Sequence, residues 1–286
     1  MARRIAALAV GALALWPLVE PHLRVVRRTT VPALPPGSAS LRILHLSDLH
    51  LLPRHGRRAE WIAALAGEQA DLVVVTGDLW SDVDSLPLLV SSLGRLTRDG
   101  TPGVFVPGNN DYYRPLPPHP LHYFSGVPPA RRGPDLPWSR LSAALEAVGW
   151  SDLTHRRLRL DLATPTMLTG TDDAHLGRDR YSRVAGAVDG FGIGVTHTPQ
   201  RRVLDAMAAD GHQLLLAGHT HGGQVRLPPL GAVVTNCDLD RARARGLSRY
   251  EAAWLHVSAG LGTSPYAPIR FCCRPEATLL TVVPVG

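Results

Sequence analysis

Five short polar segments contain the residues of this chain whose types and spacing can bind metal ions. They are Asp48-Leu-His50, Thr76-Gly-Asp78, Gly108-Asn109-Asn110-Asp111, Thr196-His197 and Gly218-His219-Thr-His221. Each supplies aspartate, asparagine or histidine, whose carboxylate, amide oxygen and imidazole groups bind borderline divalent metals. One such segment alone is typical of an ordinary turn, because aspartate and glycine suit turn backbone. The joint pattern of five segments is what indicates a metal site.

Each segment directly follows a short apolar run that is typical of a β-strand. These runs cover residues 41–46, 72–75, 104–106, 192–195 and 214–217, and helical patterns cover 58–66, 86–96, 139–148 and 201–209. Strands alternating with helices predict parallel pairing through crossover helices. Ligands bind such sheets beyond the carboxyl ends of the strands, where we expect the five segments to meet. Further candidate strands at 225–227, 232–235, 254–257 and 278–283 predict a second, more antiparallel sheet.

Seven side chains are the candidate metal ligands: Asp48, His50, Asp78, Asn109, His197, His219 and His221. Four would satisfy one ion, so seven favour two. His219 and His221 are two residues apart, which in extended backbone places both rings on one side. Asp78 follows the most apolar strand and is the expected bridge between the ions. Two cations roughly 3.5–4 Å apart clamp a phosphate ester and generate a hydroxide nucleophile, so the pattern predicts phosphoester hydrolysis.

In their order along the chain, the five segments resemble those of the calcineurin-like metallophosphoesterases, from about residue 41 to 283. The resemblance implies an α/β fold, a four-layer α/β/β/α sandwich of two mixed β-sheets flanked by helices. It also implies a dinuclear centre of manganese, iron or zinc ions, whose identity stays open. Asp48, His50, Asp78 and His221 would hold one ion, and Asp78, Asn109, His197 and His219 the other.

A narrower similarity concerns the membrane-associated branch related to UDP-2,3-diacylglucosamine pyrophosphatases. It depends on Gly-Gly-Gln at 222–224, Gly-Leu-Gly-Thr at 260–263 and Pro-Ile-Arg-Phe at 268–271. This similarity implies a phosphate-bearing small-molecule or lipid substrate, with a phosphodiester or diphosphate bond in a lipid-linked or nucleotide-sugar compound.

One position departs from the family pattern. The family usually has Gly-Asn-His followed by an acidic residue, and this chain has Asn110 before Asp111; both are candidate catalytic residues. An amide can donate a hydrogen bond to a phosphoryl oxygen but cannot deliver a proton, so general-acid assistance of about 10²- to 10⁴-fold is missing at this position. Three consequences stay open: a leaving group that needs no proton, replacement by His119 or His122, or a catalytically weakened metal-binding scaffold.

The N-terminal segment, residues 1–22, contains an apolar run from Ile5 to Val19 behind Arg3 and Arg4. It favours a membrane anchor, with a cleaved export signal or a helix docked on the domain as alternatives. Arginines on both sides leave the membrane orientation open. Residues 23–40 are expected to form a strand and a Pro-rich linker, and residues 41–286 the catalytic domain, with a Pro-rich lid loop at 112–138.

The chain carries a formal charge of +6, and all thirty of its basic residues are arginines. They are scattered rather than clustered with aromatics, which makes nucleic acid an unlikely partner. Arg178, Arg180 and Arg183 either grip a second phosphate or form a solvated face. Three cysteines cannot form a disulfide framework. The oligomeric state stays open.

Overall fold

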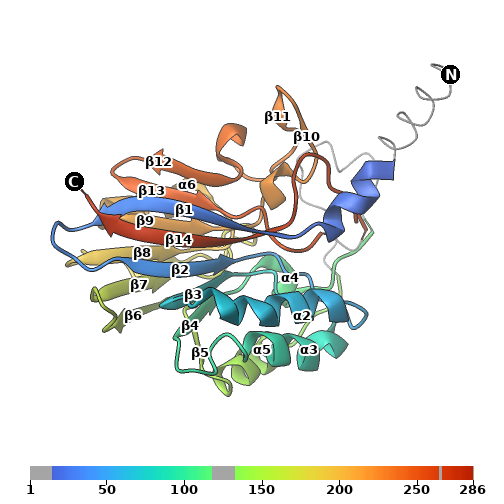
Figure 1. Ribbon diagram of the computed structural model, residues 1–286, viewed down its shortest axis with the longest axis horizontal. Helices are drawn as coiled ribbons and strands as arrows, with labels where there is room; N and C mark the ends of the chain where they lie inside the picture. Colours follow the sequence, from blue (N-terminus) through green and yellow to red (C-terminus); the bar gives the residue numbers. More distant parts are fainter. Residues whose placement is uncertain (1–14, 118–132, 264–265, 286) are drawn as a thin grey trace.

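Two six-stranded β-sheets packed face to face form the centre of the molecule (Figure 1). The computed structural model describes residues 15–117, 133–263 and 266–285. In spatial order the first sheet contains β1 (Val25–Leu34), β14 (Glu276–Pro284), β2 (Leu41–Leu46), β3 (Leu72–Thr76), β4 (Gly103–Val106) and β5 (Trp150–Asp152). The second contains β12 (Gly246–Tyr250), β13 (Ala253–Val257), β9 (Leu214–Ala217), β8 (Phe191–Val195), β7 (Thr166–Gly170) and β6 (Arg156–Leu160).

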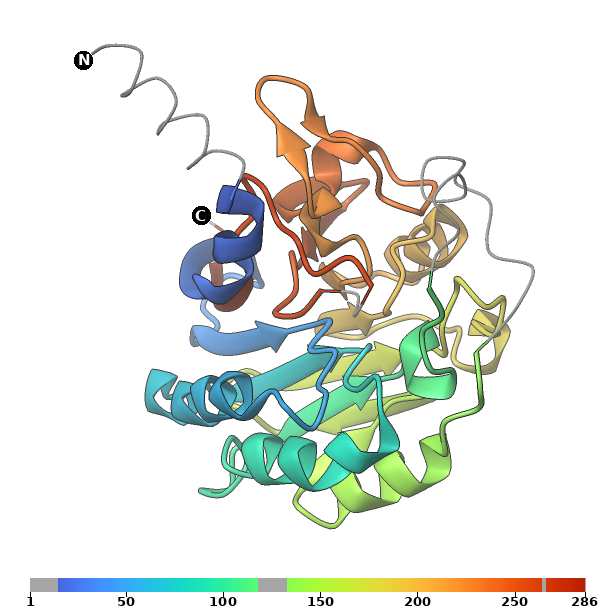
Figure 2. The same cartoon turned by 90° about the vertical axis from the view of Figure 1, so that its right-hand side faces the viewer.

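Helices cover the outer faces of both sheets. Helices α2 (Gly56–Ala64), α3 (Leu86–Leu93) and α5 (Trp138–Glu146) lie together on the first sheet, as Figures 1 and 2 show, and α6 (Arg201–Ala209) packs on the second. The shorter elements are α4 (Asn109–Tyr112), the hairpin β10 (Arg226–Leu227) and β11 (Gly231–Ala232), and the 3₁₀ turns η1 (Glu20–His22), η2 (Leu65–Glu68), η3 (Val83–Ser85), η4 (Tyr181–Arg183), η5 (His221–Gly223) and η6 (Arg241–Arg243). The predicted α/β/β/α sandwich is confirmed.

Strand β3 shows why most of the central strands are apolar at every position. Val73 and Val75 pack with the helices, while Leu72 and Val74 pack against the second sheet. Because side chains alternate between the faces of a strand, a strand covered on both faces needs apolar residues at every position. The same reasoning applies to β4, β8 and β9, which supply three more of the segments that carry the candidate ligands. Strand β2 supplies the remaining one and is an exception, because it also contains Arg42 and the buried His45, whose ring contacts His256 and Thr76.

The C-terminal strands do not form the separate, more antiparallel sheet that the sequence predicted. Strand β14 lies in the first sheet between β1 and β2, while β13 joins the second sheet parallel to β9. Only the edge strands β12 and β6 pair antiparallel there. Short apolar runs indicate burial but do not encode the direction or the neighbour of a strand, which explains the error.

The predicted boundary at residue 41 is also corrected. Strand β1 pairs with β14 in parallel from Val25 onward, and Arg27 forms an ion pair with the buried Glu276. Residues 25–34 form a strand, as predicted for this segment, but the strand is an edge strand of the first sheet and so belongs to the domain instead of preceding it. Pro32 is tolerated because an edge strand has unpaired positions on one side.

Two predicted segments lie largely outside the described residues. Most of the candidate anchor belongs to residues 1–14, and the candidate lid, with His119 and His122, belongs mainly to residues 118–132. Across the described ranges, the structure contains no helix with the length and apolar character that crossing a bilayer requires.

Candidate metal centre

The five polar segments meet where β2, β3 and β4 of the first sheet and β8 and β9 of the second reach their carboxyl ends. One group of potential donor atoms comprises Asp48, His50 and His221, which lie within 4.8 Å of one another. His50 Nε2 is 3.2 Å from His221 Nε2, and His221 Nε2 is 3.5 Å from Asp48 Oδ1. The two imidazole rings stack with centroids 5.0 Å apart. We call this group the inner half of the site.

A second group of donors comprises Asp48, Asp78 and His197, also within 4.8 Å of one another. His197 Nε2 lies 3.6 Å from Asp78 Oδ2 and 3.3 Å from His219 Nδ1. Together with His219 we call this group the outer half. Asp78 Oδ2 is also 3.4 Å from His50 Nε2. The Asp78 carboxylate therefore lies between the halves, where a bridging ligand would be, and Asp48 has donors in both groups.

The histidine rings are held by the nitrogen that faces away from the cluster. His197 Nδ1 contacts the Thr76 carbonyl oxygen at 2.6 Å, His50 Nδ1 contacts Ser81 Oγ at 3.2 Å, and His219 Nε2 contacts the Asn236 carbonyl oxygen at 3.2 Å. Metal-binding histidines are typically oriented in this way by an outer hydrogen bond. The opposite nitrogens thus face one another across the space between the carboxylates, and this donor set fits divalent cations.

Burial and charge set the protonation of the cluster. Burial lowers the pKa of His50 to about 4 and lowers those of His219 and His221 well below their usual range. Burial also lowers the pKa of His197, but the Asp78 and Asp48 carboxylates outweigh it and raise that pKa to about 9. His50, His219 and His221 are therefore neutral, which is the form that divalent metals bind, whereas His197 would have to release a proton when a cation binds.

Five of the candidate ligands have left-handed backbone, a conformation that non-glycine residues rarely adopt. Their φ angles are 50° for Asp48, 43° for His50, 54° for Asp78, 69° for His219 and 49° for His221. Such strained residues concentrate at functional sites. The extended backbone predicted for residues 219–221 is therefore wrong: the two rings separate, and His219 contacts His197 while His221 contacts His50.

The Gly108–Asp111 segment supports Asp78. The Asn110 side-chain amide donates to Asp78 Oδ2 at 2.7 Å, and its backbone N–H donates to Asp78 Oδ1 at 2.8 Å. Asp111 is fully buried and accepts the backbone N–H groups of Asp78, Leu79 and Gly108, each at 2.8 Å. With its oxygens occupied this way, Asp111 has the contacts of a positioning residue, not of one that touches substrate.

Asn109 is the seventh predicted ligand. It begins α4 and is half-buried. Within the described part of the chain, its side-chain amide has no hydrogen-bond partner, and its role as a ligand stays a prediction. Gly108 and Gly218 explain how the ligand loops approach one another, because a Cβ at Gly108 would overlap Asp78 Oδ1 and one at Gly218 would overlap Ser47 Oγ.

Sequence reasoning missed the residues beneath His221. Arg270 is fully buried and donates to the carbonyl oxygens of Ala259 at 2.7 Å and Gly262 at 2.6 Å. One of its terminal nitrogens lies 3.4 Å from His221 Nδ1. The buried Glu20 accepts the backbone N–H groups of Cys272 and Cys273, which tie the N-terminal segment to the same loop. The only sequence signal was the Pro-Ile-Arg-Phe segment itself.

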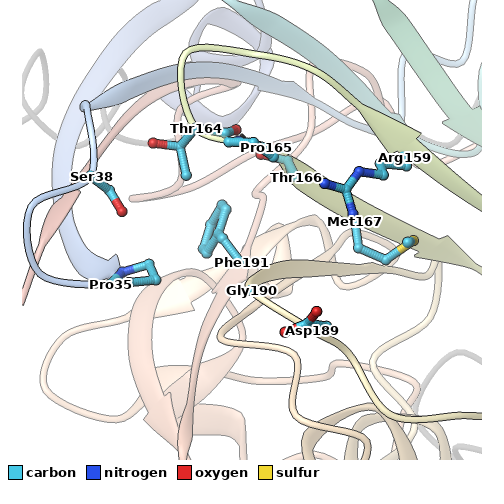
Figure 3. Close-up of a pocket in the computed structure, with 10 residues that line it drawn as sticks. All are labelled: Pro35, Ser38, Arg159, Thr164, Pro165, Thr166, Met167, Asp189, Gly190 and Phe191. Carbon is cyan, nitrogen blue, oxygen red and sulfur yellow. Dashed lines mark hydrogen bonds between the residues drawn. The ribbon is translucent and has the colours of Figure 1, made fainter.

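A separate cavity of about 260 Å³ lies at the opposite end of the sheets (Figure 3). Thr166 begins β7 and Phe191 begins β8, so the cavity opens at the amino ends of these strands. None of the predicted ligands lines it. Its lining residues are Pro35, Ser38, Arg159, Thr164, Pro165, Thr166, Met167, Asp189, Gly190 and Phe191. Geometry and donor chemistry place the candidate site at the other end.

Comparisons with known proteins identify relatives of the chain. A family model described as calcineurin-like phosphoesterase matches residues 41–223, more than half of the chain. The uncharacterized metallophosphoesterase YkoQ of Bacillus subtilis is 29% identical over 250 residues, covering 85% of this chain and 84% of that protein. A transmembrane protein with metallophosphoesterase domain from Bos taurus is 29% identical over 272 residues, covering 87% of this chain and 54% of that protein. The crystal structure of TT1561 of Thermus thermophilus aligns with a TM-score of 0.46 and 14% identity, covering 78% of this chain and 91% of that one.

Proposed function

Because this chain belongs to the calcineurin-like phosphoesterase family and is a hydrolase, we propose that it cleaves a phosphodiester or diphosphate bond with two divalent cations bound between its two sheets. The observation that supports this most directly is the paired arrangement of donors. Asp48, His50 and His221 form one donor group, and Asp48, Asp78 and His197 form a second, with His219 next to His197. The Asp78 carboxylate lies 3.4 Å from His50 and 3.6 Å from His197, between the two groups.

Some residues of the site would bind the cations, and others orient the ligand side chains. When bound, the cations would neutralise phosphate oxygens and activate a water nucleophile. Thr76, Ser81 and Asn236 hold the rings of His197, His50 and His219 so that their opposite nitrogens would be free to bind the cations. Asn110 holds Asp78 in place and contributes an amide donor, not a proton. A leaving group that departs without protonation, such as the phosphate of a diphosphate, suits this chemistry.

Metal content and turnover of the full chain test the proposal. Protein purified without added metal should contain up to two divalent ions per chain by elemental analysis. It should hydrolyse bis-p-nitrophenyl phosphate, lose turnover in chelator and regain it with Mn²⁺. A parallel screen over lipid diphosphates, nucleotide-sugars and phosphodiesters would define the substrate class. Turnover that survives complete metal removal would contradict the mechanism.

A metal-binding scaffold is the second candidate function, and the Asn110 contact to Asp78 favours it as well as the first. Asn110→His separates the two. A dormant scaffold should gain turnover of roughly 10²-fold or more when an imidazole acid is restored. An enzyme adapted to a diphosphate should gain little or lose activity, because its leaving group needs no proton and Asp78 loses a hydrogen bond.

We also propose that the N-terminal segment contacts a lipid bilayer. Leu15, Trp16, Leu18 and Val19 are 61, 41, 53 and 45% exposed, and they follow the apolar sequence of residues 5–14. The hairpin β10–β11 projects on the same side of the molecule in both views, with Leu230 at its turn 80% exposed (Figures 1 and 2). Together these residues offer an apolar surface to lipid.

Trp16 provides a direct test. Vesicles containing phospholipids brominated on the upper acyl chain should quench tryptophan fluorescence of the full chain. Trp16→Phe should remove most of that quenching, because Trp16 is 41% exposed, whereas Trp80 and Trp150 are buried and the other tryptophans are half-buried. Trp61→Phe, which changes a half-buried tryptophan on α2, is the control. Equal quenching in the Trp16→Phe and Trp61→Phe proteins would contradict contact of this segment with lipid.

A further inference from the structure

A turn beside the outer half of the site presents a fixed guanidinium group. Arg178 Nε donates to Asp172 Oδ2 at 3.2 Å, and the guanidinium carbon lies 3.9 Å from the centroid of the Tyr112 ring. The Tyr112 hydroxyl donates to Asp172 Oδ1 at 2.9 Å. Tyr112 and Asp172 are 8% and 6% exposed. The buried Tyr112 ring therefore packs against the face of the guanidinium, and the buried Asp172 carboxylate binds its Nε. These two contacts fix the orientation of the group.

Backbone hydrogen bonds fix the turn that carries Arg178. The Asp173 carboxylate accepts the N–H groups of His175 and Leu176, each at 3.1 Å, and the Arg178 N–H donates to the Asp173 carbonyl oxygen at 3.0 Å. Asp173 also accepts the hydroxyl of Thr198 at 2.9 Å. Because Thr198 follows the candidate ligand His197, the turn is attached directly to the outer half of the site.

Two contacts connect this turn to the metal centre. The His175 ring contacts the His219 ring, with centroids 4.9 Å apart. Tyr112, under the guanidinium, is two residues from Asn110, whose side chain contacts Asp78. Arg178 thus lies on the side of the site where the family has a histidine and this chain has an amide.

The guanidinium has donors to spare. Its Nε is used by Asp172, and the side chain is 44% exposed. Within the described residues, its two terminal amino groups make no hydrogen bond. A planar guanidinium held in one orientation is well suited to donate two parallel hydrogen bonds to a phosphate.

We propose that Arg178 forms an anion subsite for a second phosphate group next to the one that the metal centre binds. The ligand class is a diphosphate or a diphosphate diester, in which the Arg178-bound phosphate belongs to the leaving group. This inference rests on the proposed function. It explains how a site with Asn110 handles its leaving group: a charged donor stabilises the departing phosphate, which needs no proton.

Two nucleotides that lack a cleavable diphosphate bond test the subsite independently of turnover. We would measure dissociation constants of α,β-methylene-ADP and of AMP by calorimetry on the full chain loaded with Mn²⁺. Both ligands share the nucleoside, and only the first has a second phosphate. Wild-type protein should bind α,β-methylene-ADP more tightly. Arg178→Met should weaken its binding about 10- to 100-fold and change AMP binding much less, since a hydrogen bond to a charged group is lost.

Arg180→Met is the matched control, because it removes the same charge from the same turn at an exposed residue. Among the described residues, the Arg180 side chain makes no hydrogen bond or ion pair with Tyr112 or Asp172. It should keep the wild-type preference. Arg178→Lys, which retains charge without the planar fork, should restore only part of it. The subsite is overturned if wild-type protein shows no preference for the second phosphate, or if Arg178→Met and Arg180→Met behave alike. Turnover of bis-p-nitrophenyl phosphate reports separately on the proposed function.

Discussion

The two halves of the metal centre are built from similar residues but have different surroundings. In the inner half, His50 and His221 stack on each other and are backed by Ser81 and the fully buried Arg270. The outer half adjoins Asn110 and the turn that carries His175 and Arg178. The inner half is enclosed by structural residues, whereas the outer half is next to groups that can meet a substrate.

The electrostatics differ in the same way. Burial dominates at His50 and lowers its pKa to about 4, while carboxylates outweigh burial at His197 and raise its pKa to about 9. Two imidazoles at similar depth thus have opposite shifts, because His197 faces three aspartates and His50 faces Asp78 together with cationic arginines. Residue type and burial alone do not decide the charge of a ligand; its neighbours do.

The largest effect is expected at the residue shared by both halves. Asp78→Asn removes the charge between the two cation positions, so turnover should fall at least ~10²-fold and metal content should fall as well. Kinetics with bis-p-nitrophenyl phosphate and elemental analysis measure the two effects. Asp84→Asn, an exposed change on the neighbouring turn, should leave both unchanged. Full activity in Asp78→Asn protein would remove Asp78 from the mechanism.

Substitutions confined to one half test whether two separate ion positions exist. His50→Ala and His219→Ala should each reduce bound metal from two ions per chain to about one, because the donor nitrogen of each ring meets a histidine nitrogen of its own half. The double variant should approach zero. If His50→Ala alone released all the metal, the division into halves would be wrong.

Arg270 contacts His221 on the side of the ring that faces away from the donor cluster, so its replacement tests the inner half indirectly. Arg270→Met removes the donor next to His221 Nδ1 and leaves several buried carbonyl oxygens without a partner. Loss of such an outer contact should weaken binding of one ion about 10- to 100-fold while the other ion binds as before. Competitive titration with a metal indicator measures both steps. Equal weakening of the two steps would show that Arg270 supports the whole site.

The smallest effect is expected at Glu20, which does not contact a candidate ligand but binds the loop that carries Arg270. Glu20→Gln keeps the shape but removes the charge that accepts two backbone N–H groups, so the free energy of unfolding should fall by about 1–3 kcal/mol. Urea unfolding measures this, with the exposed Glu60→Gln as control. A loss no larger than that of the control would show that the N-terminal segment is not tied to the inner half through this carboxylate.

The layers and most candidate ligands followed from the sequence because their signals are local. Apolar runs at 41–46, 72–75 and 214–217 do form strands, and each is followed by polar residues at the predicted edge. A strand covered on both faces is mainly apolar, and a metal ligand must carry a donor atom, so both requirements are visible in the residue types.

Residue type alone did not reveal the contacts of Arg270, Glu20 and Arg178, although the sequence singled out Arg178 as a possible phosphate-binding residue and Arg270 within the Pro-Ile-Arg-Phe segment. Their importance depends on contacts with residues far along the chain, such as Arg270 with His221 and Arg178 with Tyr112. The place of β14 between β1 and β2 is of the same kind. Sheet order and the left-handed backbone of the ligands were decided by tertiary packing, because long-range contacts and not local propensity determine which buried groups face one another.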